Sequence, residues 1–233
     1  MSPDPTPERD PLEAELRARF DVRTERFTVG GFDVELLLPR TPEDLIDVSA
    51  FNSDERLPYW AELWPSGRAL ARWLVEAPAL PAGPAIELGC GVALPALALA
   101  GRSGELVLAT DYYADALEFA IANARRNGDL PLGTRLLDWR DIPPELLGRF
   151  GFLLAADVLY ELRNVEMLAE AISHLLAPGG TVWLADPRRV YLSIFRDRMC
   201  EAGWTIEEES VREPSNIAPE GSVEIRLLTL RRG

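Results

Sequence analysis

The sequence predicts an α/β fold with a doubly wound, mostly parallel sheet, and three observations support this. From about residue 57 onward, short apolar runs alternate with helical segments, as in a parallel sheet covered by helices on both faces. A glycine turn, Gly89-Cys90-Gly91, follows the first of these buried runs. Several of the runs end at an acid, which places carboxylates at the rim where such sheets bind ligands. These strand-end acids are Asp111, Asp138, Asp157 and Asp186.

The amino-terminal part predicts a small extension that precedes the main fold. Residues 1–10 are polar and rich in proline, so we expect a disordered tail there, followed by the extension over residues 11–56. Pro11–Phe20 has the apolar spacing of a short helix, and a Gly30-Gly31 turn joins two strand-like segments into a hairpin. The two segments are Arg26–Val29 and Phe32–Leu38. A second helix is expected to begin at Thr41-Pro42-Glu43-Asp44, where a cap, a proline and first-turn acids coincide.

Residues 57–233 predict one domain that contains the main sheet. Its expected parallel strands are Ala85–Leu88, Glu105–Thr110, Leu132–Leu137, Phe152–Ala156 and Thr181–Ala185. The expected helices are one that ends near Glu76, then Leu94–Ala100, Tyr113–Asn127, Asn164–Ala177 and Val190–Ala202. Pro178-Gly179-Gly180 is expected to separate the fourth of these helices from the fifth strand. The chain is expected to end in an antiparallel pair, Trp204–Val211 and Val223–Leu230.

The glycine turn has the residues of a nucleoside-binding site. Gly89 and Gly91 allow a sharp turn and a close approach of the backbone to a ligand. Asp111 lies 24 residues after Glu87, where a nucleotide-binding sheet offers a carboxylate to ribose hydroxyls. A dinucleotide site requires a third glycine where this chain has Leu94, so a nucleoside cofactor without a pyrophosphate fits better. The alternative is that the two glycines only form a tight turn between strand and helix.

Composition limits the partners and the compartment. The formal charge is −14 and the chain contains no lysine, so its surface repels nucleic acid and favours a basic partner. The alternative is an acidic surface that only confers solubility. No apolar run reaches membrane-spanning length, so we expect no membrane partner, and the first residues lack a signal-peptide pattern. Two cysteines and one histidine, without zinc-ligand spacing, lead us to expect a cytoplasmic protein with no metal.

Several motifs resemble a known enzyme class. The pattern Glu87-x-Gly89-x-Gly91 with a downstream Asp111 resembles class I, or seven-strand, S-adenosylmethionine-dependent methyltransferases, which have a Rossmann-like fold. Asp157-Val158-Leu159-Tyr160 matches the Asp-x-x-Tyr motif of the protein lysine methyltransferases of methyltransferase family 16. The segments Trp60–Gly67 and Leu137–Trp139 also look like segments of this family. The extended motif Asp157–Glu161, together with Asp186-Pro187-Arg188, is most similar to the electron-transfer-flavoprotein β-subunit lysine methyltransferases.

The resemblance implies a cofactor site for S-adenosylmethionine along the first three strands. Glu87 and the turn formed by Gly89 and Gly91 would approach the methionine and ribose parts of this cofactor. Asp111 would hold the ribose hydroxyls, and Asp138-Trp139 would meet the adenine by a hydrogen bond and by packing.

The resemblance also implies an acceptor site beyond the fourth strand. Asp157 and Tyr160 would face the methyl acceptor as the catalytic pair, with Asp157 orienting an ammonium rather than acting as a strong base. Trp64 would close over the cofactor. The pair Arg188-Arg189 stands where the most similar relatives have Gly-Arg.

Three aromatic side chains, Tyr59, Trp60 and Trp64, precede the first helix of the domain and allow two interpretations. They either attach this segment to the sheet or line the mouth of the site, where their faces would attract a sulfonium or ammonium cation.

The function expected from these residues is methyl transfer to a nitrogen, most simply to lysine side chains of a protein. The alternative is a small-molecule N- or O-methyltransferase, because one fold accepts many substrates. A nucleotide-dependent oxidoreductase is disfavoured because the third glycine and an evident hydride-transfer acid–base pair are missing. A catalytically silent cofactor-binding module is disfavoured by the acids at the rim.

Overall fold

The computed structural model describes residues 10–40, 58–215 and 221–232. The strands are β1 Val22–Val29, β2 Phe32–Pro39, β3 Ala85–Leu88, β4 Val107–Asp111, β5 Leu132–Leu136, β6 Phe150–Ala156, β7 Leu176–Asp186, β8 Trp204–Pro214 and β9 Ser222–Arg232. The α-helices are α1 Pro11–Arg19, α3 Pro65–Glu76, α4 Leu94–Ser103, α5 Ala114–Arg126, α6 Leu162–Leu175 and α7 Leu192–Glu201. Two short 3₁₀ helices are η2 Tyr59–Ala61 and η3 Pro144–Leu146.

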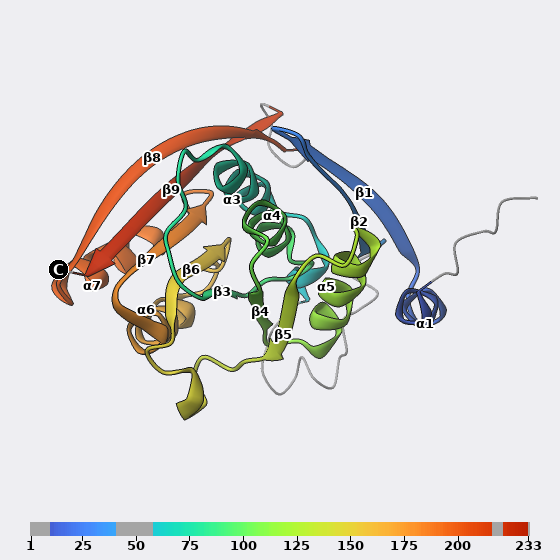
Figure 1. Ribbon diagram of the computed structural model, residues 1–233. Helices are drawn as coiled ribbons and strands as arrows, with labels where there is room; N and C mark the ends of the chain where they lie inside the picture. The colour runs from blue at the N-terminus through green and yellow to red at the C-terminus, as the bar shows by residue number, and fades with distance from the viewer. Residues whose placement is uncertain (1–9, 41–57, 216–220, 233) are drawn as a thin grey trace, which may run out of the picture.

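Within the described ranges, seven strands form one sheet in the order β5-β4-β3-β6-β7-β9-β8 (Figure 1). The first five in this order are parallel, and β9 runs antiparallel to both β7 and β8. Strands β1 and β2 form a separate antiparallel hairpin. The predicted doubly wound, mostly parallel seven-stranded sheet is therefore confirmed, as are the hairpin and its preceding helix.

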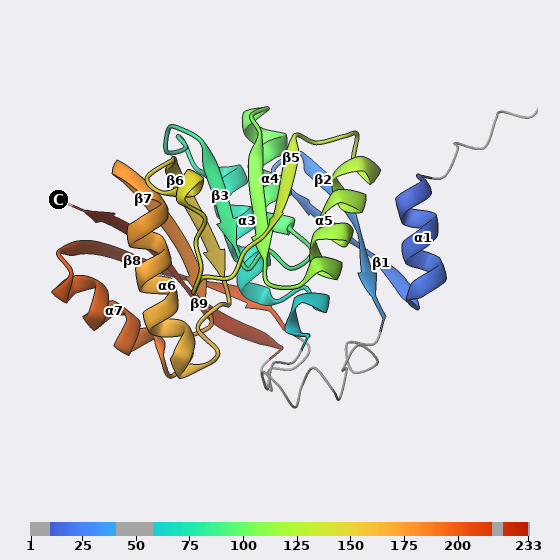
Figure 2. The same ribbon diagram turned by 90° about the horizontal axis from the view of Figure 1, so that it is seen from below.

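Helices cover both faces of the main sheet (Figure 2). Apolar residues of α3, α4 and α5 pack on one face, and those of α6 and α7 pack on the other. The β1-β2 hairpin lies outside the first layer and contributes Phe27 and Leu36 to its core, while Leu16 of α1 belongs to a smaller cluster with Phe119 of α5. Among the described helices, none is long and apolar enough to cross a membrane.

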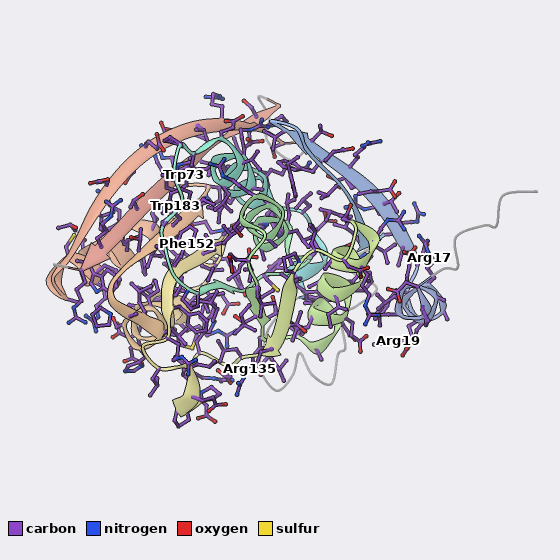
Figure 3. All side chains as sticks on the ribbon, viewed as in Figure 1. Arg17, Arg19, Trp73, Arg135, Phe152 and Trp183 are labelled. Atoms are coloured by element: carbon purple, nitrogen blue, oxygen red, sulfur yellow. The ribbon has the colours of Figure 1, made fainter. Side chains whose placement is uncertain are left out.

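A stack of aromatic rings fixes α3 on the sheet (Figure 3). The ring of Trp73 lies parallel to that of Trp183 on β7, with centroids 4.0 Å apart and an interplanar angle of 9°. Phe152 on β6 meets Trp183 edge-on at 5.2 Å. Such pairs add about 0.5–1.5 kcal/mol beyond the burial of their area. This contact holds α3 across β6 and β7, and the amino-terminal end of the helix reaches the functional rim described below.

The main departure from the predicted elements is at the start of β7. The expected helix end at Ala177 and strand start at Thr181 are wrong, because the helix ends at Leu175 and the strand begins at Leu176. The residues Pro178-Gly179-Gly180 form an irregularity inside the strand, since Phe150 pairs with Leu176 but Phe152 pairs with Thr181. A Cβ on Gly180 would lie 2.6 Å from Leu176 Cγ, so this tight fold requires glycine.

Further expectations concern the amino-terminal part of the chain. Strand β1 begins at Val22 rather than Arg26, because charged residues alternate with the buried ones and obscured the strand pattern. The disordered tail, the helix expected at residues 41–44 and the domain boundary at residue 56 fall wholly or mainly outside the described residues, so all three stay predictions.

Candidate active site

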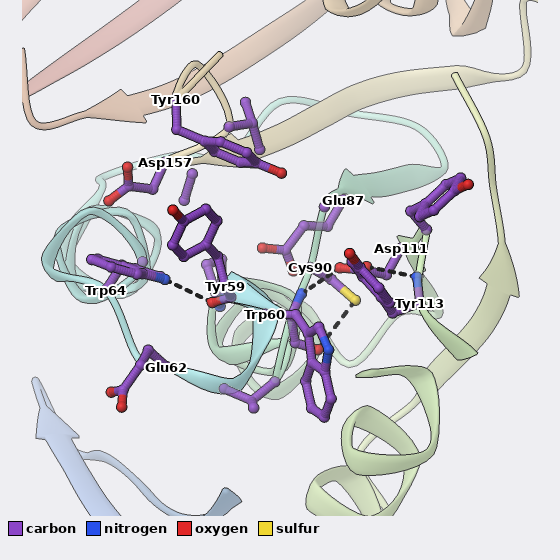
Figure 4. A pocket seen from close by; sticks show the side chains of 18 of the residues that line it. Tyr59, Trp60, Glu62, Trp64, Glu87, Cys90, Asp111, Tyr113, Asp157 and Tyr160 are labelled. Carbon is purple, nitrogen blue, oxygen red and sulfur yellow. Dashed lines mark hydrogen bonds between the residues drawn. The ribbon is translucent and has the colours of Figure 1, made fainter. Parts of the chain in front are cut away.

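All nine residues predicted for the site line one pocket at the carboxyl ends of the parallel strands. They are Trp64, Glu87, Gly89, Gly91, Asp111, Asp138, Trp139, Asp157 and Tyr160. The pocket and its open mouth contain about 990 Å³ of space. In Figure 4, Asp111 and Tyr113 lie on one side of Glu87, while Asp157, Tyr160 and Trp64 lie on the other side. We call these two sides the cofactor end and the acceptor end.

The glycine turn at the cofactor end is closed on one side by backbone. Gly91 has a φ of 52°, and a Cβ there would lie 2.9 Å from the carbonyl oxygen of Trp60. Gly89 has a φ of 67°, and its Cβ would lie 3.0 Å from a side-chain carbon of Val158. Both positions therefore require glycine, and the bare backbone of the turn faces the pocket.

Glu87 is buried under the turn and supports the helix that follows it. One carboxyl oxygen, Oε2, accepts a hydrogen bond of 2.9 Å from the N–H of Ala96, in the first turn of α4. The residue before α4, Ala93, has a left-handed conformation and gives no side-chain cap, so Glu87 supplies the acceptor that a capping residue would. Burial raises the pKa of Glu87 to about 8; the Ala96 N–H opposes this, and the Asp111 carboxylate adds to it.

Asp111 connects the glycine turn to the loop after β4. Its Oδ2 accepts a hydrogen bond of 2.9 Å from the N–H of Gly91, and its Oδ1 accepts one of 3.0 Å from the N–H of Tyr113. The residue is only 6% exposed, and this exposed part lies in the pocket wall. Its carboxylate is thus held in place at the pocket wall by the backbone of two loops.

Asp138 and Trp139 form the far wall of the cofactor end. Both oxygens of Asp138 accept hydrogen bonds from the Arg140 guanidinium, at 2.6–3.0 Å, so this carboxylate already has a partner. Trp139 packs against the core beside the glycine turn, with a ring carbon 3.7 Å from a Cβ placed on Gly89. The position of Trp139 suits packing against an adenine, and the hydrogen bond expected from Asp138 stays a prediction.

The acceptor end is built around Asp157, directly after β6. Its φ of 59° lies in the left-handed region, which is strained for a residue with a side chain. Oδ1 accepts a 2.5 Å hydrogen bond from Nε of Arg189, and Oδ2 accepts one of 3.3 Å from the hydroxyl of Ser66 at the start of α3. Burial raises the pKa of Asp157 above its usual range, although Arg189 and Ser66 act in the opposite direction.

Aromatic side chains flank this carboxylate. The ring centroid of Tyr59 lies 5.3 Å from that of Tyr160 and 6.0 Å from that of Trp64, both edge-on. The indole N–H of Trp64 donates to the backbone carbonyl of Tyr59, at 2.8 Å. Trp60 packs its ring on Phe119 in the core, with centroids 5.5 Å apart. Trp60 thus attaches the segment to the core, and all three aromatic side chains also line the pocket, while the attraction of a cation to their faces stays a prediction.

Two residues of the acceptor end were not among the predicted site residues. Ser66 and Arg189 come from segments far from Asp157 in the sequence, and only the tertiary fold brings them to its carboxylate. The sequence contained one signal, since Arg189 follows the strand-end acid Asp186 and belongs to the motif that resembles known methyltransferases.

The residues of the pocket fit S-adenosylmethionine. A bare glycine turn admits the ribose and methionine parts, the fixed carboxylate of Asp111 suits ribose hydroxyls, and Trp139 offers a flat apolar face. Fold and pocket together define a class I S-adenosylmethionine-dependent methyltransferase.

Comparison with known proteins identifies the family within this class. Residues 51–198, more than half of the chain, match the lysine methyltransferase family (methyltransferase family 16), and the chain belongs to this family. It is 29% identical over 138 residues to the electron transfer flavoprotein β-subunit lysine methyltransferase of Xenopus laevis, a match that covers 58% of this chain and 55% of that protein. The protein of the same name from Mus musculus is 27% identical over 194 residues, covering 78% of this chain and 72% of the other.

A solved structure shows the same fold. Magnesium protoporphyrin IX methyltransferase from Synechocystis, solved with bound S-adenosylmethionine, superposes with a TM-score of 0.56 at 20% identity. The superposition covers 81% of this chain and 86% of that one.

Proposed function

We propose that the chain transfers a methyl group from S-adenosylmethionine to the ε-amino group of a lysine in a protein. One observation carries this proposal beyond family membership: Asp157 is buried at the acceptor end and already binds a side-chain cation, Arg189, at 2.5 Å. A carboxylate that holds one cationic side chain can hold another. Bound S-adenosylmethionine supplies an electrophilic methyl group on a sulfonium sulfur.

The residues of the acceptor end would position the lysine. A free lysine has a pKa of about 10.4, so it arrives as an ammonium, which Asp157 captures and orients. Because a carboxylate stabilises the charged amine, its contribution is orientation, and the proton leaves to water. The rings of Tyr160 and Tyr59 lie edge to face where the stem of the side chain would enter. Positioning of this kind supplies much of the rate in a displacement reaction.

The relatives indicate which acceptor to test first. The relatives compared above are named for the β subunit of electron transfer flavoprotein, and we propose the corresponding protein of the same organism as acceptor. A net charge of −14 favours a basic segment around the methylated lysine. The cytoplasmic location and the absence of nucleic-acid and membrane partners, expected from the sequence, stay predictions.

The test compares Asp157→Asn with Asp197→Asn, an exposed substitution on α7. We expect kcat/KM for the flavoprotein subunit to fall roughly a hundredfold or more in Asp157→Asn, since a buried charge partner of the acceptor is removed. Calorimetry should show unchanged affinity for S-adenosylhomocysteine, and Asp197→Asn should behave as wild type. Because the chain contains no lysine, any methyl-lysine found by peptide mass spectrometry belongs to the acceptor. Labelling of small amines but of no protein would contradict the proposal.

A further inference from the structure

Arg189 lies where the acceptor ammonium is expected. Its Nε donates to Asp157 Oδ1 at 2.5 Å, and its guanidinium carbon lies 5.8 Å from the ring centroid of Trp64. The Asp157 side chain is 4% exposed, whereas that of Arg189 is 30% exposed. The carboxylate is thus fixed inside the wall of the pocket, and its cationic partner reaches it from the solvent side.

We propose that Arg189 is a specificity-determining residue that occupies the acceptor cation's place on Asp157 until a protein lysine displaces it. This inference rests on the proposed function, because it takes Asp157 as the acceptor-binding carboxylate. An ammonium and a guanidinium both bind carboxylates by charge-assisted hydrogen bonds, so the two cations are chemically interchangeable at this oxygen.

The local geometry admits one cation at a time. Oδ1 of Asp157 accepts from Arg189 at 2.5 Å and Oδ2 accepts a longer bond of 3.3 Å from the Ser66 hydroxyl, so the cation of Arg189 already lies against the carboxylate that the acceptor needs. A second cation beside the first would be repelled, since like charges at contact distance oppose each other. Arg189 has to be replaced rather than simply lost, because the Asp157 side chain is only 4% exposed and a buried carboxylate without a cation is strongly disfavoured. The arriving ammonium takes over the charge-assisted hydrogen bond, while the partly exposed guanidinium returns to water.

The backbone of Arg189 stays anchored while its side chain moves. Its N–H donates to Oδ1 of Asp186 at 2.7 Å, and Asp186 is completely buried at the end of β7. The preceding residue, Arg188, has a φ of 62° and bonds outward to Glu224 at 3.0 Å. The loop is therefore held by its own contacts, and only the Arg189 side chain has to rotate for the site to open.

An arginine suits this place because the enzyme cannot methylate it in the way that it would methylate a lysine. A guanidinium stays protonated in proteins and offers no free amine lone pair to the methyl donor. Because Arg189 occupies Asp157, the apparent affinity for any amine is its intrinsic affinity multiplied by the fraction of molecules in which Asp157 is free. This reduction is the same for both kinds of amine and leaves the ratio of their affinities unchanged. A free amine has no other contacts to offset it, so only a lysine presented on a protein reaches a useful affinity.

The test measures binding of n-butylammonium, a mimic of the lysine side chain, by NMR titration in the presence of S-adenosylhomocysteine. Mildly alkaline pH favours the ionised form of Asp157, whose pKa is raised by burial. Arg189→Met should bind the probe about three- to tenfold more tightly than wild type, the range for loss of a partly exposed competing ion pair. The matched control Arg188→Met should bind it as wild type does. Equal or weaker binding by Arg189→Met, or no binding to either protein, would overturn the inference.

Two further variants separate this inference from the proposed function. Arg189→Gln keeps a polar side chain at the position, and it should shift binding in the same direction if Arg189→Met does not fold. Asp157→Asn should lose the probe altogether. If it binds the probe as wild type does, the acceptor site lies elsewhere and the proposed function is wrong in its central residue. If Asp157→Asn loses the probe while neither Arg189 variant gains affinity, only the role of Arg189 is refuted.

Discussion

Glu87 and Asp111 at the cofactor end are held in a different way from Asp157 at the acceptor end. At the cofactor end, Glu87 and Asp111 accept hydrogen bonds from backbone N–H groups of the glycine turn and of the segments beside α4 and α5. At the acceptor end, Asp157 is held by two side chains, those of Arg189 and Ser66. Backbone donors cannot leave unless the fold changes, whereas a side chain needs only a rotamer change.

This difference shows how one scaffold can keep its cofactor and vary its substrate. The cofactor end is preformed by the same hydrogen bonds that complete the fold, so its geometry is inherited with the sheet. The acceptor end depends on side chains from α3 and from the loop after β7, which a single substitution can change. Variants should therefore divide into those that affect stability and cofactor together and those that affect the acceptor alone.

The largest expected effect on stability comes from Glu87. Since its folded pKa of about 8 lies above the ordinary 4.5, the folded state binds the extra proton between these values. The contribution of Glu87 to the free energy of unfolding should then be largest below pH 4.5 and be lost as the pH rises to about 8, by on the order of a few kcal/mol. Glu87→Gln should remove most of this slope in urea unfolding measured across the range, since its amide oxygen can still accept from Ala96.

Asp186, at the end of β7 beside the acceptor end, provides the matched comparison for Glu87. Burial raises its pKa to about 6, so Asp186→Asn should flatten the profile only between pH 3.8 and about 6. A wild-type profile without a fall between pH 6 and 8 would mean that Glu87 is charged in the folded protein, and the contrast between the two ends would weaken.

The next effect concerns the glycine turn, where Gly91→Ala can be compared with Gly104→Ala. Both glycines have a positive φ, but only at Gly91 would the Cβ meet backbone, at 2.9 Å from the Trp60 oxygen. Gly104→Ala should cost about 1–2 kcal/mol of stability from conformation alone. Gly91→Ala should cost about 2–4 kcal/mol because overpacking is added. Calorimetry should show weaker S-adenosylhomocysteine binding only for Gly91→Ala; equal effects on affinity would refute the close approach of the turn to the cofactor.

The same contrast explains how much could be predicted from sequence. The cofactor end was predictable because Gly89, Gly91 and Asp111 belong to consecutive segments, and the carboxyl ends of parallel strands meet at one rim. The identity of the partners of Asp157 was not predictable, because Ser66 and Arg189 lie 91 and 32 residues from it in the sequence. Contacts of this kind depend on where α3 and the loop after β7 finally pack.

The predicted ends of the strands show the same difference between local features and features that depend on tertiary packing. The bulge in β7 was missed because Pro178-Gly179-Gly180 has the composition of a loop, and only the pairing with β6 makes it part of a strand. Likewise, the sequence could not reveal that Trp60 packs on Phe119 in the core while its neighbour Tyr59 packs on Tyr160 at the acceptor end, although both line the pocket.

The smallest expected effect is that of Ser66→Ala, which tests whether the acceptor end can change without the cofactor end. The hydroxyl lies 3.3 Å from Asp157 Oδ2, a long hydrogen bond, so its loss should lower the free energy of unfolding by only about 0.5–1.5 kcal/mol. The KM for the acceptor should change severalfold, because Asp157 loses the donor that orients it, while affinity for S-adenosylhomocysteine stays constant. Ser173→Ala removes a comparable hydroxyl, bonded at 2.9 Å to the Ala169 carbonyl within α6, and should leave both constants unchanged. If Ser66→Ala weakened cofactor and acceptor binding equally, the two ends would be mechanically coupled and their separate behaviour would be disproved.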